Sequence, residues 1–162
     1  MARSSFVEKT WLTEDNLKAC CVFVPDSHRC GYVGVGSEHP LYGVEYQDSV
    51  DCLKGAYSEA MESEAENLRG PMISLMYAMT EEDERFSPEL VFNVHGGITF
   101  SRSGAEGGYP ISEDLWWFGF DCAHCDDKTL YQDGVTLQDI RSLDYVSEEC
   151  EKLAKQLVLI KK

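Results

Sequence analysis

The sequence has no long apolar run and little positive charge. No apolar run is long enough to span a bilayer, and the first residues show no apolar segment followed by a small-residue cleavage site. We therefore expect a cytoplasmic protein. Lys and Arg number 14 against 29 Asp and Glu, a net charge of -15 at pH 7. Such a surface repels phosphate backbones and anionic lipids, so we expect no nucleic acid and no membrane as partners.

The common catalytic motifs are also missing. There is no HExxH and no GxSxG, and the glycines at 34–36 lack the third glycine and the following helix of a dinucleotide-binding loop. The seven cysteines are an odd number without a secretion signal, which predicts reduced and mostly buried thiols. No repeat or low-complexity linker divides the chain, so we expect one domain over residues 1–162.

The apolar spacing predicts an α+β fold, with a mixed or antiparallel sheet, helices packed on one face and a C-terminal helix. A short helix capped by Thr13 is also expected near residue 15. Alternating or β-branched runs predict strands, and three- and four-residue spacings predict helices. The expected elements are a hairpin at 18–36, strands at 41–46, 90–100 and 115–122, and helices at 48–68, 72–79 and 139–160. Gly70-Pro71 is expected to end the first of these helices.

The stretch "LWWFGFDCAHCDD" at 115–127 concentrates aromatic, thiol, imidazole and carboxylate groups. Both faces of its strand are apolar, which predicts a central strand covered on both sides. A carboxylate at the end of a buried strand is costly unless it is paired or bound. Asp121, His124 and Asp126 follow in quick succession at that point. A functional site is therefore expected at the end of this strand.

Two metal hypotheses arise from these residues. Cys122 and Cys125 have the spacing of half a structural zinc site, but a second pair of that kind is missing. Alternatively, His95, Asp121 and His124 have the ligand types of a mononuclear hydrolase that uses zinc or manganese. If strands 90–100 and 115–122 pair, these groups converge. Asp126 would then orient the attacking water.

A third hypothesis is a small-molecule pocket, for which we expect no cofactor. Gly96 and Gly97 would let the backbone approach a ligand closely, and glycines at 104–108 would form a flexible flap. Aromatic side chains would supply a stacking wall, namely Tyr32, Tyr42, Tyr109 and Trp116. The candidates for meeting an anion are Arg29, Arg69, Arg102 and Arg141. Ordinary structural roles stay open beside all three hypotheses: a hydrogen-bonded His95, an Asp121 bound to its own turn and a core Trp116.

Four segments, "HRCGYVGVGSEHPLYG", "VHGGITF", "LWWFGFDCAHCDD" and "LDYVSEECEKLAKQL", resemble a family of small bacteriophage and prophage proteins without a settled function. The resemblance implies a phage context, and hence the host-cell cytoplasm. Small acidic phage proteins of this size often inhibit a defence enzyme or sequester a signalling nucleotide. The residues that match the family's polar signature are His39, His95, Gly96, Gly97, Asp121, His124 and Asp126.

The leading hypothesis is a protein that sequesters a nucleotide-derived defence signal. Its pocket would lie between the bend at 95–97, the rim at 121–126 and the loop at 101–110. The predicted ligand-binding residues are His39, His95, Gly96, Gly97, Arg102, Tyr109, Trp116, Asp121, His124 and Asp126. The alternatives are a metal-dependent hydrolase of a nucleotide-like ligand and an acidic inhibitor of a host defence factor. Enzymatic activity is left open, and so is a homo-oligomer formed through the apolar stripe of the last helix.

Overall fold

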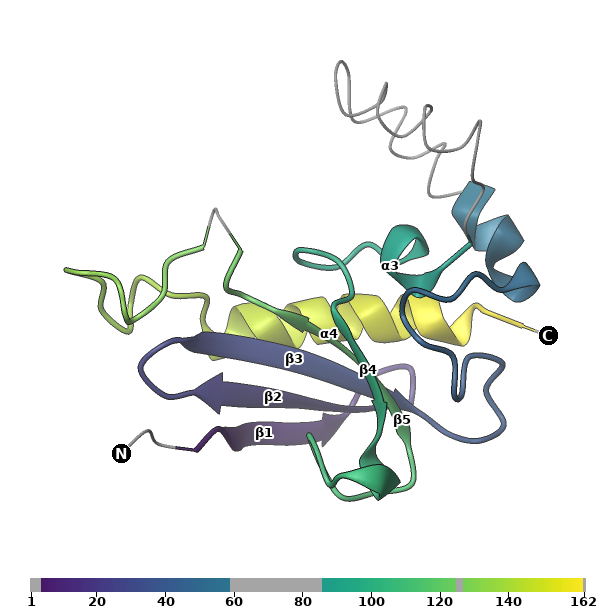
Figure 1. Ribbon diagram of the computed structural model, residues 1–162, viewed down its shortest axis with the longest axis horizontal. Coiled ribbons are helices and arrows are strands. Elements are labelled where there is room, and N and C mark those ends of the chain that lie inside the picture. The colour runs from purple at the N-terminus through teal and green to yellow at the C-terminus, as the bar shows by residue number, and fades with distance from the viewer. Residues whose placement is uncertain (1–3, 59–85, 125–126, 162) are drawn as a thin grey trace, which may run out of the picture.

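The computed structural model describes residues 4–58, 86–124 and 127–161. Its centre is a five-stranded sheet in the order β1-β2-β3-β5-β4, in which every neighbouring pair is antiparallel (Figure 1). The strands are β1 (Phe6–Leu12), β2 (Lys18–Val24), β3 (His28–Val35), β4 (Phe100–Ser103) and β5 (Trp116–Asp121). The prediction of an α+β fold with an antiparallel sheet and a C-terminal helix is confirmed.

The first strand and its turn replace the short helix that the sequence predicted near residue 15. β1 pairs with β2, and residues 13–17 form the turn between them. Thr13 caps no helix there. Its backbone carbonyl accepts from Asn16 N, its Oγ1 accepts from Leu17 N at 3.0 Å, and Asn16 adopts a φ of 65°. A left-handed residue of this kind closes a tight turn and interrupts a helix.

β5 is a central strand buried on both faces, as its sequence predicted. Its side chains alternate: Trp116, Phe118 and Phe120 enter the larger core cluster, whereas Trp117 enters a smaller one. The larger cluster lies beneath helix α4 (Leu143–Val158), which packs along β3 and β2. Cys122, the residue after β5, enters the same larger cluster as Val146 and Cys150 of α4.

The other face of the sheet is covered by the loop between β4 and β5. Tyr109, Ile111 and Leu115 of this loop pack against the smaller core cluster. The hydroxyls of Tyr32 and Tyr109 are 2.7 Å apart, and both rings meet Phe100 edge-on. This loop begins with the short helix η2 (Gly104–Glu106). The glycine-rich segment is therefore an ordered cover for apolar side chains.

The strand predicted over 90–100 is wrong for most of its length. Helix α3 (Pro88–Val91) opens the segment, residues 92–99 are irregular, and β4 begins only at Phe100. Pro88 stands at the first turn of α3, where its fixed φ favours a helix. Gly96 and Gly97 then adopt φ values of 69° and 80°, which no regular strand accommodates.

The strand predicted at 41–46 is also wrong, because a series of turns occupies residues 37–43 and Gly43 has a φ of 83°. The helix predicted over 48–68 is found as η1 (Asp51–Leu53) continued by α-helix to residue 58. The remainder of that helix, Gly70-Pro71, Arg69 and the helix at 72–79 lie outside the described residues. Among the described helices, none has the length and apolar content needed to cross a membrane.

Both ends of α4 have defined partners. Ser142 caps the N-terminus, since its Oγ accepts from Tyr145 N at 3.1 Å, and the helix therefore begins a few residues later than predicted. Near the other end, His39 Nε2 lies 2.8 Å from the carbonyl oxygen of Leu157, and Leu41 N donates to His39 Nδ1 at 3.0 Å. A nitrogen that accepts from Leu41 leaves the proton on Nε2. Neutral His39 thus fastens the end of α4.

This contact predicts a pH-dependent stability. Burial lowers the pKa of His39 below 6.5, although the Leu157 carbonyl opposes the shift. The unfolded chain therefore binds more protons in this range, and the free energy of unfolding decreases as the pH falls below about 6.5. His39→Ala should lower that free energy by about 1–2 kcal/mol at pH 7.5, through two lost hydrogen bonds, and should weaken its decrease towards pH 5.5. Chemical denaturation at both pH values measures the two effects.

Ser37→Ala is the matched control, because Ser37 is an exposed residue of the same turn. It should keep the parent's pH dependence. Equal changes in unfolding free energy between pH 7.5 and 5.5 for His39→Ala and the parent would contradict the assigned role.

Candidate functional site

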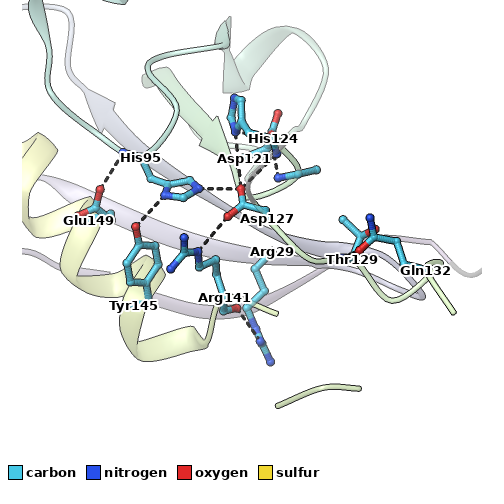
Figure 2. Close-up of polar contacts among 11 residues, drawn as sticks. Arg29, His95, Asp121, His124, Asp127, Thr129, Gln132, Arg141, Tyr145 and Glu149 are labelled. Carbon is cyan, nitrogen blue, oxygen red and sulfur yellow. Dashed lines mark hydrogen bonds and ion pairs between the residues drawn. The ribbon is translucent and has the colours of Figure 1, made fainter. Parts of the chain in front are cut away.

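The candidate site lies where the chain leaves β5 and where it approaches β4. Because these strands are antiparallel, the end of β5 and the segment before β4 reach the same end of the pair, and Thr99 N donates to Gly119 O at 2.9 Å. His95 comes from the second segment, and His124 and Asp127 come from the first (Figure 2). One nitrogen or oxygen from each lies within 4.8 Å of the others. Residues far apart in the sequence thus form one cluster.

His95 is held by three hydrogen bonds. Its Nε2 lies 2.7 Å from Asp127 Oδ2, and its Nδ1 lies 2.7 Å from the Tyr145 hydroxyl. Its backbone N–H donates to Glu149 Oε1 at 2.7 Å. An ionised Asp127 only accepts, so His95 donates to it from Nε2, and in the tautomer with its proton on that nitrogen Nδ1 accepts from the Tyr145 hydroxyl. Two partners on α4 therefore fix the position of His95.

Asp127 is the buried carboxylate of the cluster, with a side chain that is 0 % exposed. Burial by itself would raise its pKa. The hydrogen bonds from His95, from Arg141 Nε at 2.9 Å and from His124 N at 3.1 Å outweigh this effect, and the pKa lies below its ordinary value. Asp127 is therefore ionised at neutral pH and fully hydrogen-bonded.

Arg141 is positioned from both sides. Its guanidinium carbon lies 4.7 Å from the centre of the Tyr145 ring, and its backbone carbonyl accepts from Arg29 Nη1 at 3.0 Å. Figure 2 shows the contact between Arg29 and Arg141. Arg29 also pairs with Glu8 at 2.8 Å, which links the site to β1. The Arg141 side chain remains 41 % exposed. The sequence named Arg141 as a candidate for meeting an anion, and within the fold it meets Asp127.

His124 differs from the other members because one of its two ring nitrogens, Nδ1, lacks a hydrogen-bond partner among the described residues. That nitrogen is also shielded from solvent. This atom lies 3.5 Å from Asp121 Oδ1 and 3.8 Å from Asp127 Oδ2, beyond ordinary hydrogen-bonding distance. A buried polar atom without a partner costs free energy, so its retention requires an explanation.

The lack of a side chain at Gly96 leaves the space that the His124 ring occupies. A Cβ built on Gly96 would lie 2.1 Å from His124 Cε1, which is far inside contact distance. Gly97 has a similar positive φ, but the nearest atom to its Cβ would be Glu89 O at 3.8 Å. Of the two glycines, Gly96 thus makes the expected close approach, and it does so to an imidazole of the same chain.

Of the predicted ligand-binding residues, the structure brings together His95, Gly96, Gly97, Asp121 and His124, whereas Asp126 and Cys125 lie outside the described residues. Asp121 Oδ1 accepts from Ala123 N at 3.1 Å, the turn contact that the sequence left open as a structural role. Cys122 is buried in the core, and this burial raises the pKa of its thiol well above its ordinary value.

The other predicted residues lie elsewhere. His39 holds the end of α4, and Trp116 Nε1 donates to Val44 O at 2.8 Å inside the core. Tyr109 covers the opposite face of the sheet, and Arg102 packs over Gly107. Ser103 pairs with Trp116, so loop 104–115 joins the start of β5 while the cluster lies at its end. Within the described part of the chain, the loop after β4 and the rim at 121–124 therefore lie at opposite ends of β5 and do not face one another across a single pocket.

Three residues of the site were not predicted from the sequence: Asp127, which belongs to the cluster, and Tyr145 and Glu149, which hydrogen-bond to His95. Tyr145 and Glu149 lie four residues apart on α4, a spacing that places both on one face of the helix. This spacing is the only sequence signal that could have suggested them. His28, at the start of β3, is also close: burial lowers its pKa, and the charges of Asp121 and Asp127 oppose this.

Comparison of the chain with protein-family models, with curated proteins and with solved structures finds no match. The resemblance to small phage proteins therefore stays a prediction. The chemistry of the cluster is argued from the residues themselves: two imidazoles, one buried carboxylate, and a phenol and a guanidinium that hold them.

Alanine substitutions at the two glycines test the packing of His124. Both should cost about 1–2 kcal/mol, because alanine disfavours a positive φ. Gly96→Ala should cost about 1–3 kcal/mol more than Gly97→Ala, because its methyl group displaces the His124 ring. The free energy of unfolding measures the difference, and the imidazole NMR signals of His124 should move only in Gly96→Ala. Equal losses of stability with unchanged His124 signals would contradict the contact.

Proposed function

We propose that the protein binds one divalent cation, zinc or manganese, through His95, His124 and Asp127, and holds a small-molecule ligand at the coordination positions that remain open. The single observation that carries this proposal is the orphaned His124 Nδ1 beside a buried carboxylate. Two imidazoles and one carboxylate are a donor set that borderline divalent cations favour. Three protein ligands leave room for water or substrate, as in catalytic rather than structural zinc sites.

The distances suit a cation after a small adjustment. His95 Nε2 and Asp127 Oδ2 are 2.7 Å apart, and His124 Nδ1 and Asp127 Oδ2 are 3.8 Å apart. Tetrahedral zinc with bonds of about 2.0–2.1 Å places its ligand atoms about 3.3 Å from one another, so these two separations would change by roughly half an ångström each. The separation between the two imidazoles, which is within 4.8 Å, would shorten by up to about 1.5 Å. Side-chain rotation supplies shifts of this size.

The surrounding residues support the same assignment. A metal-bound histidine ordinarily donates its other N–H to an oxygen, and a metal-bound carboxylate is ordinarily hydrogen-bonded as well. Tyr145 stands at His95 Nδ1, and Arg141 holds Asp127 Oδ1, the oxygen that does not face the cluster. Because the Tyr145 hydroxyl can either donate or accept, His95 can move its proton to Nδ1 and free Nε2 for the cation.

Zinc titration of the metal-free protein tests the proposal. Calorimetry should give one zinc per chain, with manganese binding more weakly, as the usual order of divalent affinities requires. His124→Ala should weaken zinc binding by about 100-fold or more, since even the loss of an outer partner costs 10–100-fold. The variant should keep the parent's unfolding free energy within about 1 kcal/mol, because no hydrogen bond of Nδ1 is lost.

His28→Asn is the matched control, because it removes a nearby imidazole that is not part of the three-residue cluster. Its zinc affinity should equal that of the parent. Zinc binding that survives His124→Ala but is lost in Cys122→Ser would overturn the assignment in favour of the CxxC alternative.

A second candidate function, metal-assisted hydrolysis, is favoured by the position of Asp121. Its side chain is 37 % exposed, its Oδ1 lies 3.5 Å from His124 Nδ1, and within the described residues its Oδ2 makes no hydrogen bond. A carboxylate next to a bound cation can accept the proton of a metal-bound water. The sequence predicted that Asp126 orients the water and that Asp121 is a metal ligand. Asp121 is the described residue that could accept the proton.

Asp121→Asn separates binding from hydrolysis, because the amide oxygen preserves the contact with Ala123 N. Zinc stoichiometry should not change, whereas turnover of bis(p-nitrophenyl) phosphate by the zinc-loaded protein should fall about 100-fold. Bound zinc without turnover in the parent protein would leave binding alone as the function. Sequestration of a nucleotide-derived signal and inhibition of a host defence factor, the two other hypotheses drawn from the sequence, stay predictions.

A further inference from the structure

A surface cavity of about 470 Å³ adjoins the cluster on its Arg141 side. Asp127 belongs both to the cavity wall and to the cluster. Arg141 and Tyr145, which contact Asp127 and His95, also line the cavity. The rest of the wall comes from Lys128, Gln138, Asp139, Ile140 and Ser142. A ligand in this cavity would therefore touch the residues that hold His95 and Asp127 in place.

The cavity's two carboxylates accept hydrogen bonds, and its two cations are Arg141, which pairs with Asp127 through Nε, and Lys128. Asp127 is bonded through both oxygens, and Asp139 Oδ2 accepts from Thr136 N at 2.9 Å and from Thr136 Oγ1 at 3.1 Å. Arg141 uses only Nε on Asp127. Its terminal nitrogens are hydrogen-bonded to no residue within 4–58, 86–124 and 127–161. Lys128 is exposed and forms no ion pair within 4.0 Å in those ranges, although its charge helps to lower the pKa of Asp139 after the hydrogen bonds from Thr136.

We propose that this cavity binds a phosphate-type oxyanion, received by the outer edge of the Arg141 guanidinium and by Lys128. The inference rests on the proposed function, because it names the ligand class of the same site. A guanidinium edge with two parallel N–H groups matches two oxygens of a phosphate. Stacking on Tyr145 and the Arg29 contact fix Arg141 before the ligand arrives, which limits the entropy lost on binding.

The charge of the whole chain makes this placement selective. With a net charge of -15, most of the surface repels an oxyanion, whereas the formal charges of this wall balance, with Lys128 and Arg141 against Asp127 and Asp139. A cation bound by His95, His124 and Asp127 would add positive charge at the same wall.

Titration with inorganic phosphate at low ionic strength, on both the metal-free and the zinc-loaded protein, tests the inference. Metal-free protein should bind one phosphate, and zinc-loaded protein should bind it more tightly. Lys128→Gln should weaken both interactions by about tenfold, the effect expected for one charge-assisted contact. It should leave the zinc affinity measured without phosphate unchanged, since among the described residues no hydrogen bond or ion pair joins the Lys128 side chain to His95, His124 or Asp127. Acetate, which has fewer oxygens, should bind more weakly than phosphate.

Lys155→Gln is the matched control, because it removes one exposed positive charge from α4 outside this cavity. It should bind phosphate as the parent does. Equal effects of the two lysine variants, or acetate binding as tight as phosphate binding, would overturn the oxyanion site. Phosphate bound only by zinc-loaded protein, with no effect of Lys128→Gln, would also overturn it but leave the metal proposal intact. Absence of zinc binding, with Lys128-dependent phosphate binding retained, would reject the metal proposal alone.

Discussion

The buried charge of Asp127 is the constraint on which the candidate site depends. A carboxylate with no exposed surface is strongly unfavourable unless donors replace its water. His95, Arg141 and the backbone of His124 supply those donors, and they come from the loop before β4, the segment before α4 and the loop after β5. One carboxylate thereby holds three irregular segments at the end of the sheet. Removing any of its donors would leave a buried charge short of a partner.

The same hydrogen bonds compete with the proposed cation. In the metal-free protein His95 and Asp127 satisfy each other at 2.7 Å, so a cation must replace that bond as well as shed water. Such a site binds less tightly than a cage of free ligands, but its ligand atoms are already oriented. His124 shifts the balance, because its Nδ1 has no hydrogen-bond partner among the described residues and would gain one if a cation entered the cluster. This asymmetry favours an exchangeable ligand over a permanent structural ion.

Residue patterns predicted the parts of the fold that local sequence controls. The apolar residues on both faces of the segment 116–122 predicted that β5 is buried on both sides, and its side chains do enter both core clusters. The apolar stripe of α4 predicted that this helix packs on the sheet. The loop holding His95 escaped prediction because an apolar run looks alike in a strand and in a short helix followed by a bend. Asp127 escaped because its partners lie 14 and 32 residues away, a pairing that only the tertiary fold creates.

Arg141 connects the two halves of the site. Its Nε neutralises Asp127 while its outer edge faces the neighbouring cavity, so a ligand that pulls on the guanidinium also alters the hydrogen bonding of the carboxylate. An oxyanion would draw charge away from Asp127 and make that carboxylate a stronger ligand for a cation. The cation would in turn attract the oxyanion. Each would therefore tighten the other's binding by the same factor, as thermodynamic linkage requires. In an acidic chain this reciprocity allows one arginine to serve both the fold and the ligand.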